Sequence, residues 1–188
     1  MNEQQRRPER LPSRQKALKL LSQVGCSRAV IRHCRTVAAV ATEIAEACQK
    51  KGFNVDVKLV EIGALLHDIG RSKTHSVHHA RAGVELAKSL NLPRSIVSII
   101  DRHVGGGITV EEAKRIGWKP KSYVPRTLEE KIVSYADMII EGARRVPIEK
   151  AIEKFSKKLP LASIEGMRKL HEEITSLLRD CDADSNAA

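Results

Sequence analysis

Residues 59–70 read LVEIGALLHDIG, the segment that is most informative about the fold class. Placed on a helix at about 100° per residue, its apolar side chains surround the axis, which is typical of a helix buried on every side. His67 and Asp68 fall in the last turn, so both side chains are expected to face protein. A buried ionised carboxylate is unfavourable unless it is paired or bound to a metal ion. This His-Asp pair is therefore the first candidate for a functional site.

Helical patterns continue on both sides of this segment, and no segment alternates apolar and polar residues over the length of a strand. Thr127 and Glu130 have the spacing of a capping box, which predicts the start of a long helix. The fold class predicted is all-α, a single-domain compact helical bundle. The predicted helices cover 27–52, 56–69, 77–90, 94–104, a short stretch after Thr109, 127–146, and two segments beginning at Pro147 and Ser163.

The chain has 188 residues, a length that fits one domain with tails. We expect a flexible basic tail over 1–14, a helical domain over 15–179 and a second flexible tail over 180–188. Within the domain, residues 27–145 carry the candidate site, and 147–179 add two further helices.

The charge of the chain favours an anionic partner. The formal net charge is +10, and the tails contribute +2 and −3, so the body carries +11. Such a body suits nucleotides, nucleic acid or phosphorylated small molecules, and charge alone does not choose among them. Aromatic residues make up only 3% of the chain, which disfavours a platform for stacking bases.

Several features predict a cytoplasmic protein that does not enter membranes. No apolar run approaches the roughly 20 residues of a membrane span, and the first residues lack the apolar core of a secretory signal. Four cysteines have no metal-binding spacing and are interpreted as reduced thiols.

Imidazoles on other helices also fall on or beside apolar faces. His103 lies over Ile96 and Ile99, His79 shares a face with Leu86, and His33 lies at the edge of an apolar arc. One such histidine is more often a core residue than a ligand, but several histidines with a buried Asp are harder to explain in that way. Imidazole with carboxylate suits Mn, Fe, Co, Ni or Zn.

The last acidic candidate is Asp137, at the flank of the apolar stripe of its helix. Helical geometry does not select this residue, because a role as a ligand and a position facing solvent are equally compatible with the pattern.

These residues resemble the HD superfamily of metal-dependent phosphohydrolases. The order that defines the superfamily is His, then His-Asp, then a distant Asp, which His33, His67, Asp68 and Asp137 match. The stretch ALLHDIGR is similar to the HDIG form of the central motif. The resemblance covers about residues 27–145, implies the HD-domain fold and selects Asp137 as a ligand.

Two further histidines extend the resemblance to members with six ligands. HHARAG places His79 in a ligand position, and IIDRH does so for His103. The full set resembles the dinuclear branch, which includes symmetrical diadenosine tetraphosphate hydrolases. No GYP motif follows, which disfavours the cyclic dinucleotide phosphodiesterase branch.

The resemblance implies a phosphohydrolase that uses metal-activated water to cleave a phosphoester or phosphoanhydride bond of a nucleotide or dinucleotide. It implies two divalent transition-metal ions per site, with Fe or Mn favoured and Co, Ni or Zn possible. Asp68 and His67 are the expected catalytic residues, and Asp68 would bridge the ions. The ligands implied are His33, His67, Asp68 and Asp137 for one ion, with His79 and His103 for the other.

Cationic residues near these motifs are candidates for phosphate binding. Arg71 and Lys73 directly follow the HDIG turn, and Arg144 lies seven residues after Asp137, on nearly the same face of the predicted helix. An ordinary role as surface cations is an equal alternative for each.

Two rival functions remain open. The first is a helical domain that binds nucleic acid without turnover, using the +11 body, and the second is an oxygen-activating di-iron enzyme on the same fold. A homodimer is also open, because apolar residues of the two terminal helices could form an interface or complete the core.

Overall fold

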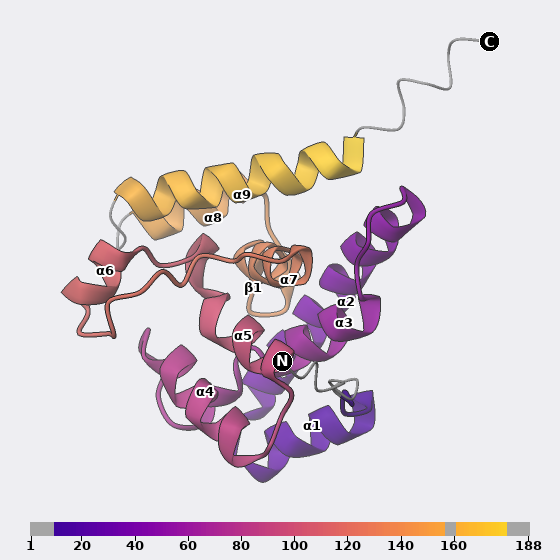
Figure 1. Cartoon of the computed structure of the whole chain (residues 1–188), viewed down its shortest axis with the longest axis vertical. Coiled ribbons are helices and arrows are strands. Elements are labelled where there is room, and N and C mark those ends of the chain that lie inside the picture. The colour runs from indigo at the N-terminus through magenta and orange to yellow at the C-terminus, as the bar shows by residue number, and fades with distance from the viewer. Residues whose placement is uncertain (1–9, 157–160, 180–188) are drawn as a thin grey trace, which may run out of the picture.

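The computed structural model describes residues 10–156 and 161–179, and the all-α prediction is confirmed (Figure 1). Within these residues, strand is confined to one antiparallel pair, and no helix is long and apolar enough to cross a membrane. The elements in order are α1 (Arg14–Gln23), α2 (Arg28–Lys50), α3 (Val57–Leu66), η1 (Ile69–Ser72), α4 (His79–Ser89), α5 (Arg94–Arg102), η2 (Val104–Gly106), α6 (Val110–Arg115), α7 (Leu128–Met138), β1 (Ile140–Glu141), β2 (Arg144–Arg145), α8 (Ile148–Ser156) and α9 (Leu161–Arg179).

Helix α3 lies inside the bundle, as the opening stretch predicts. It packs against α1, α2, α5 and α7, and Ile62, Leu65 and Leu66 are fully buried. Asp56 caps its N-terminus by accepting a hydrogen bond from the Leu59 amide. Because the helix ends in the middle of the molecule, the residues that follow it, His67 and Asp68, are also buried.

The long helix α2 covers one side of α3. Ser27 caps it by accepting a hydrogen bond from the amide of Val30, and the face turned to the core carries Cys34 and Cys48. Both thiols are buried and free, as is Cys26, in agreement with the prediction of reduced cysteines. The fourth, Cys181, lies outside the described residues.

The predicted helix over 127–146 is too long. Helix α7 ends at Met138, and the chain turns back through Gly142, at φ +63°, in a hairpin that pairs Ile140 with Arg145. Ile139 and Ile140 are buried in this non-helical conformation. Two adjacent buried residues fit a helix and a short hairpin equally well, so the apolar pattern could not locate the helix end.

The capping prediction at the start of α7 is half right. The Thr127 hydroxyl accepts a hydrogen bond from the Glu130 amide, as expected. The Glu130 carboxylate, however, accepts hydrogen bonds from the Ser98 hydroxyl and the Arg126 amide, not from the Thr127 amide. A complete capping box instead joins Thr109 and Glu112 at the start of α6.

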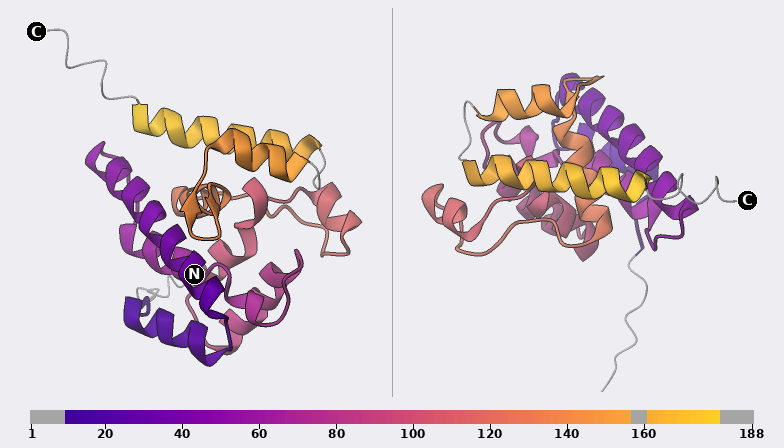
Figure 2. Two further views of the ribbon diagram at one scale, coloured as in Figure 1. Left: turned by 180° about the vertical axis from the view of Figure 1, so that it is seen from behind. Right: turned by 90° about the horizontal axis from the view of Figure 1, so that it is seen from above.

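Helices α8 and α9 pack against each other and lie at the end of the bundle opposite α1 (Figure 2). Helix α9 also contacts α7, η2 and α2. Ile152, Ile164 and Leu170 are buried within the chain, so these residues complete the core. The hairpin that follows α7 leads the chain into α8.

Candidate metal centre

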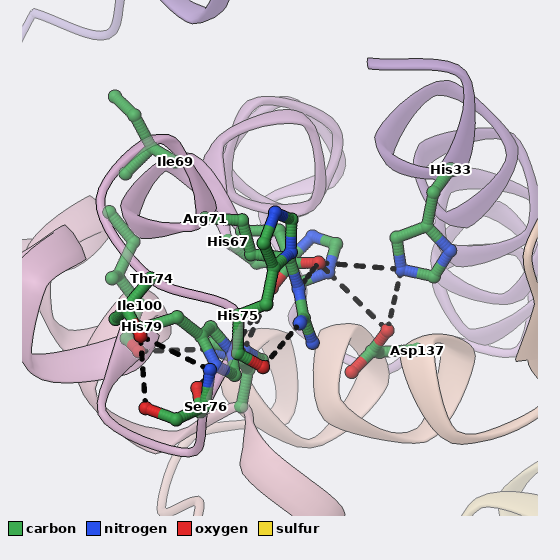
Figure 3. A network of polar contacts seen from close by, with 12 residues as sticks. His33, His67, Ile69, Arg71, Thr74, His75, Ser76, His79, Ile100 and Asp137 are labelled. Atoms are coloured by element: carbon green, nitrogen blue, oxygen red, sulfur yellow. Dashed lines mark hydrogen bonds and ion pairs between the residues drawn. The ribbon is translucent and has the colours of Figure 1, made fainter. Parts of the chain in front are cut away.

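Six side chains that are distant in sequence meet at the centre of the bundle (Figure 3). Helix α2 supplies one of these side chains, and the end of α3 supplies two. The start of α4, the end of α5 and α7 supply one side chain each. Five of the six form two overlapping groups of three, His33, His67 and Asp137 in one and His67, Asp68 and His103 in the other, and the ligand atoms of each group lie within 4.8 Å of one another. The residues are His33, His67, Asp68, His79, His103 and Asp137.

The first subsite lies between α2, α3 and α7. Asp137 Oδ1 is 2.9 Å from His33 Nε2 and 3.4 Å from His67 Nε2. Asp68 Oδ2 faces the same two nitrogen atoms, at 3.8 Å from His33 and 3.7 Å from His67. Two carboxylates and two imidazoles therefore surround one point.

The second subsite uses the other oxygen of Asp68. Asp68 Oδ1 is 3.1 Å from His79 Nε2 and 3.6 Å from His103 Nε2. These two nitrogen atoms are 3.0 Å apart. The Asp68 carboxylate thus lies between the two subsites and presents one oxygen to each.

Backbone carbonyls hold all four imidazoles in one tautomer. A carbonyl oxygen can only accept a hydrogen bond, so a ring nitrogen bonded to one must carry the proton. Each Nδ1 is bonded in this way, which leaves each Nε2 of a neutral ring with a free lone pair that points at the carboxylates. The carbonyls are those of Gly142 for His33 (2.9 Å), Ala64 for His67 (2.7 Å), Ser76 for His79 (2.7 Å) and Ile100 for His103 (2.9 Å).

This arrangement fits divalent metal ions. Among the described residues, His67 Nε2 and Asp68 Oδ1 are buried polar atoms with no hydrogen-bond partner, which is unfavourable without a cation. The Nε2 atoms of His79 and His103 are 3.0 Å apart, so their lone pairs repel each other unless a cation or proton lies between them. A hydrogen bond from the second ring nitrogen to a carbonyl is how metal-binding histidines are usually oriented.

The electrostatics of the cluster favour bound positive charge. Burial acts to lower the pKa of His67, but Asp68 and Asp137 outweigh it and raise that pKa to about 9. Burial acts in the opposite sense on the two carboxylates, yet the neighbouring histidines hold the pKa of Asp68 and of Asp137 far below the usual range. Burial lowers the pKa of His103.

Without metal, stability is expected to fall as pH rises from about 6.5 to 9. The folded-state pKa of His67 is raised, so its protonation stabilises the fold fully below its unfolded-state pKa of 6.5, and this contribution is lost as pH passes 9. The loss is on the order of 3 kcal/mol. Urea unfolding of protein treated with EDTA, at pH 6.5 and 9, measures the difference.

The matched variants for this measurement are His67→Gln and His171→Gln. His67→Gln should flatten the pH dependence, whereas His171→Gln should retain it, because His171 bonds the hydroxyl of Tyr135 outside the cluster. An unchanged slope in His67→Gln would assign the pH dependence to other groups.

The predicted phosphate-binding cations have different positions. Arg71 lies beside the cluster, where its Nε donates a hydrogen bond to Asp68 Oδ2, and it lines the cavity described below. Lys73 is exposed on the turn and is not among the residues lining that cavity. Arg144 lies exposed in β2, so its placement on one helical face with Asp137 is wrong, because α7 ends at Met138.

A cavity of about 530 Å³ opens beside the cluster. His33, His79 and Asp137 line its floor together with Arg71, and residues of the hairpin and of α8 form another wall. A volume of this size accommodates a small-molecule ligand. The cavity therefore reaches candidate ligands of both subsites, His33 and Asp137 of the first and His79 of the second.

The carbonyl of Gly142 is a site group that the sequence analysis missed. It orients His33, yet the prediction of a continuous helix would have placed it in a backbone hydrogen bond. The available signal was the glycine itself, since glycine weakens a helix interior and often marks a turn.

The sequence matches the HD domain family over residues 30–140, more than half of the chain, so the chain belongs to this family. It is 46% identical to the uncharacterized protein MJ0778 of Methanocaldococcus jannaschii, across 88% of this chain and 98% of that protein. The fold and the cluster therefore define an HD-domain protein with candidate groups for divalent metal ions.

Other relatives are longer proteins. The chain is 40% identical to the tRNA (cytidine(56)-2'-O)-methyltransferase of Picrophilus torridus, across 92% of this chain but only 49% of that protein. It is 32% identical to Ribonuclease Y of Acidothermus cellulolyticus, across 63% of this chain and 22% of that protein. Among solved structures, the L. monocytogenes PgpH HD domain in complex with cyclic-di-AMP is 21% identical with a TM-score of 0.49, across 86% of this chain and 95% of that one.

Proposed function

We propose that the chain is a metal-dependent phosphohydrolase that cleaves a phosphoester or phosphoanhydride bond of a nucleotide or dinucleotide. The observation that carries the proposal is the Asp68 carboxylate, buried between two sets of Nε2 lone pairs with one oxygen facing each. Buried ligands of this kind are unfavourable for a fold that has no use for them. Membership of the HD domain family supports the proposal.

In the proposed mechanism, each residue has a defined task. His33, His67 and Asp137, with Asp68, would hold one divalent ion, and His79 and His103, with Asp68, would hold another. Two such ions would supply Lewis acidity, which would lower the pKa of a water molecule and neutralise charge on the phosphoryl oxygens.

The rest of the chain orients these groups. The carbonyls bonded to Nδ1 fix each imidazole before substrate arrives, so little reorganisation is needed during the reaction. Arg71, at the edge of the cavity, is placed to donate hydrogen bonds to a phosphoryl oxygen, a task to which a guanidinium is well suited.

The proposed substrate class is a nucleotide, with dinucleoside polyphosphates included because six ligands are present. A second candidate is a phosphodiester bond in RNA, which the similarity to Ribonuclease Y and the basic body favour. The chain spans about half of the tRNA methyltransferases that it matches, and we assign their methyl transfer to the part that it does not cover.

Metal analysis followed by a turnover screen tests the proposed function. Elemental analysis is expected to find up to two transition-metal ions per chain, and Mn²⁺ or Fe²⁺ should support hydrolysis of at least one member of a panel. The panel contains nucleoside mono-, di- and triphosphates, dinucleoside polyphosphates and short RNA. EDTA should abolish turnover, and added Mn²⁺ should restore it.

Other outcomes separate the rival functions. Steeply salt-dependent RNA binding with no turnover would identify a binding domain, and substrate-dependent consumption of O₂ would identify an oxygenase. Turnover that persists after complete removal of metal would contradict the proposed mechanism.

A further inference from the structure

Helix α8 forms a wall of the cavity although it lies outside the matched part of the chain. The match to the HD domain family ends at residue 140, and α8 begins at Ile148. Lys150, Lys154 and Phe155 of this helix line the same cavity as the candidate ligands on its floor. The metal centre and α8 therefore face one cavity, and the match to the family model does not cover the wall that α8 forms.

The wall carries an excess of positive charge. Lys150 and Lys154 are four residues apart, so both lie on one face of α8. Glu141 of the hairpin forms an ion pair with Lys154 at 2.5 Å, and the hydrogen bond from Lys154, together with the charges of Lys154 and Lys150, lowers the pKa of Glu141. Among the described residues of this wall, Glu141 is the one carboxylate beside the two ammonium groups, which leaves one positive charge available to a ligand.

The same wall also has an apolar part. Met138, Ile140, Val146 and Phe155 line the cavity beside the lysines. Phe155 is partly buried and packs against the core. A cation next to an aromatic ring suits a ligand in which an anionic group and a flat apolar group are joined. A nucleotide has this composition, and a cavity of about 530 Å³ can hold one.

We propose that α8 is the wall that selects the substrate. Lys150 binds a phosphate group other than the one attacked at the metal centre, and Phe155 contacts the base. The inference rests on the proposed function and narrows it to nucleotides that carry a second phosphate group. That group can be joined through an anhydride, as in a nucleoside diphosphate, or through a ribose, as in a 5′-phosphorylated dinucleotide.

A role in folding does not explain Lys150. The residue is exposed, while its neighbours Ala151 and Ile152 are the buried residues that attach α8 to the core. Lys150 can therefore be replaced without removing a core contact, and its substitution tests binding rather than stability.

The experiment compares Lys150→Glu with the wild-type protein on substrates with one or two phosphate groups. Lys150→Glu is expected to raise KM at least about tenfold for the preferred substrate with two phosphates, as expected when a charge-assisted contact becomes repulsive. The KM of bis(p-nitrophenyl) phosphate, which has one phosphate, should change less than about twofold. Nucleoside diphosphate and 5′-phosphorylated dinucleotide are assayed separately to distinguish the two linkages.

Equilibrium binding gives a second readout that needs no turnover. Calorimetry with a nucleoside 5′-diphosphate and with the 5′-phosphorylated dinucleotide should show the same tenfold loss for Lys150→Glu, with no such loss for a nucleoside 5′-monophosphate. Lys19→Glu in α1, at the opposite end of the bundle, makes the same charge change and should alter neither readout (Figure 1).

The outcomes separate this inference from the proposed function. If the wild-type protein turns over no substrate, the proposed function fails, and calorimetry still decides whether Lys150 binds a second phosphate. If Lys150→Glu and wild type do not differ, or if Lys150→Glu weakens ligands with one and two phosphates equally, the inference is overturned while the metal centre is unaffected.

Discussion

Replacing Asp68 by Asn is expected to lower kcat/KM by at least about a thousandfold, the scale of losing a group that stabilises charge in the transition state. Each oxygen of Asp68 faces a different subsite, at 3.1 Å from His79 Nε2 and 3.7 Å from His67 Nε2. An amide keeps the shape but removes the negative charge and turns an NH₂ group toward one subsite. Both subsites should lose affinity together, so elemental analysis should find fewer bound ions.

The matched control is Asp56→Asn, the same change of carboxylate to amide at the N-terminus of α3. Asp56 accepts a hydrogen bond from the Leu59 amide, and Asn caps helices about as well as Asp. This variant should keep the fold, the metal content and the rate. A folded Asp68→Asn protein that retains two ions and wild-type turnover would refute the bridging role.

The sequence predicted the centre of the molecule well because burial and function coincide there. An apolar helix that ends in His-Asp must place a charge in the core, and only a partner or an ion makes that acceptable. The structure confirms that His67 and Asp68 are buried, at 0% and 1% exposure. His79 and His103 are equally inward, as their helical faces predict.

The edge of the site was less predictable. Asp137 sits where α7 is about to end, and helical periodicity could not distinguish a ligand from a residue facing solvent. In the structure Asp137 Oδ1 lies 2.9 Å from His33 Nε2, and the hairpin after Met138 turns the Gly142 carbonyl onto His33 and leads into α8 beside the cavity. The contacts that such a turn creates between distant residues leave no periodic pattern of apolar residues in the sequence, so they could not be predicted from it.

The failure at Arg144 has the same origin. Its assignment assumed that α7 continues for two more turns, so the error in the helix end moved the expected cation from the site to an exposed strand. The cations that line the cavity are instead Lys150 and Lys154 of α8. The sequence analysis treated both residues only as part of a C-terminal helix.

Gly70, the glycine that ends the HDIG stretch, is the position where fold and site depend on one close backbone contact. A Cβ atom on Gly70 would lie 1.9 Å from the carbonyl oxygen of His79 and 2.4 Å from the amide nitrogen of Gly83. Both are backbone atoms of α4, which packs on η1 and cannot move aside as a side chain can. The contact sets how close α4 lies to Asp68, and so it sets the position of the His79 imidazole.

Gly70→Ala is therefore expected to lower the free energy of unfolding by about 3 kcal/mol or more, since an added methyl group must push two packed elements apart. Urea unfolding of the metal-free protein measures this. The metal-loaded variant should also bind fewer ions than wild type, because His79 moves away from Asp68 Oδ1 when α4 shifts.

Two other glycines allow the loss of stability to be compared at positions with more space for a Cβ atom. A Cβ on Gly83 would meet the side chain of Ile100 at 2.9 Å, which can partly adjust, so Gly83→Ala should cost about 1 to 2 kcal/mol. A Cβ on Gly166 in α9 would have its nearest neighbour at 3.9 Å, so Gly166→Ala should be neutral or stabilise the helix by up to about 1 kcal/mol. If Gly70→Ala were as mild as Gly166→Ala, α4 could move freely against η1, and the second subsite could not owe its geometry to this contact.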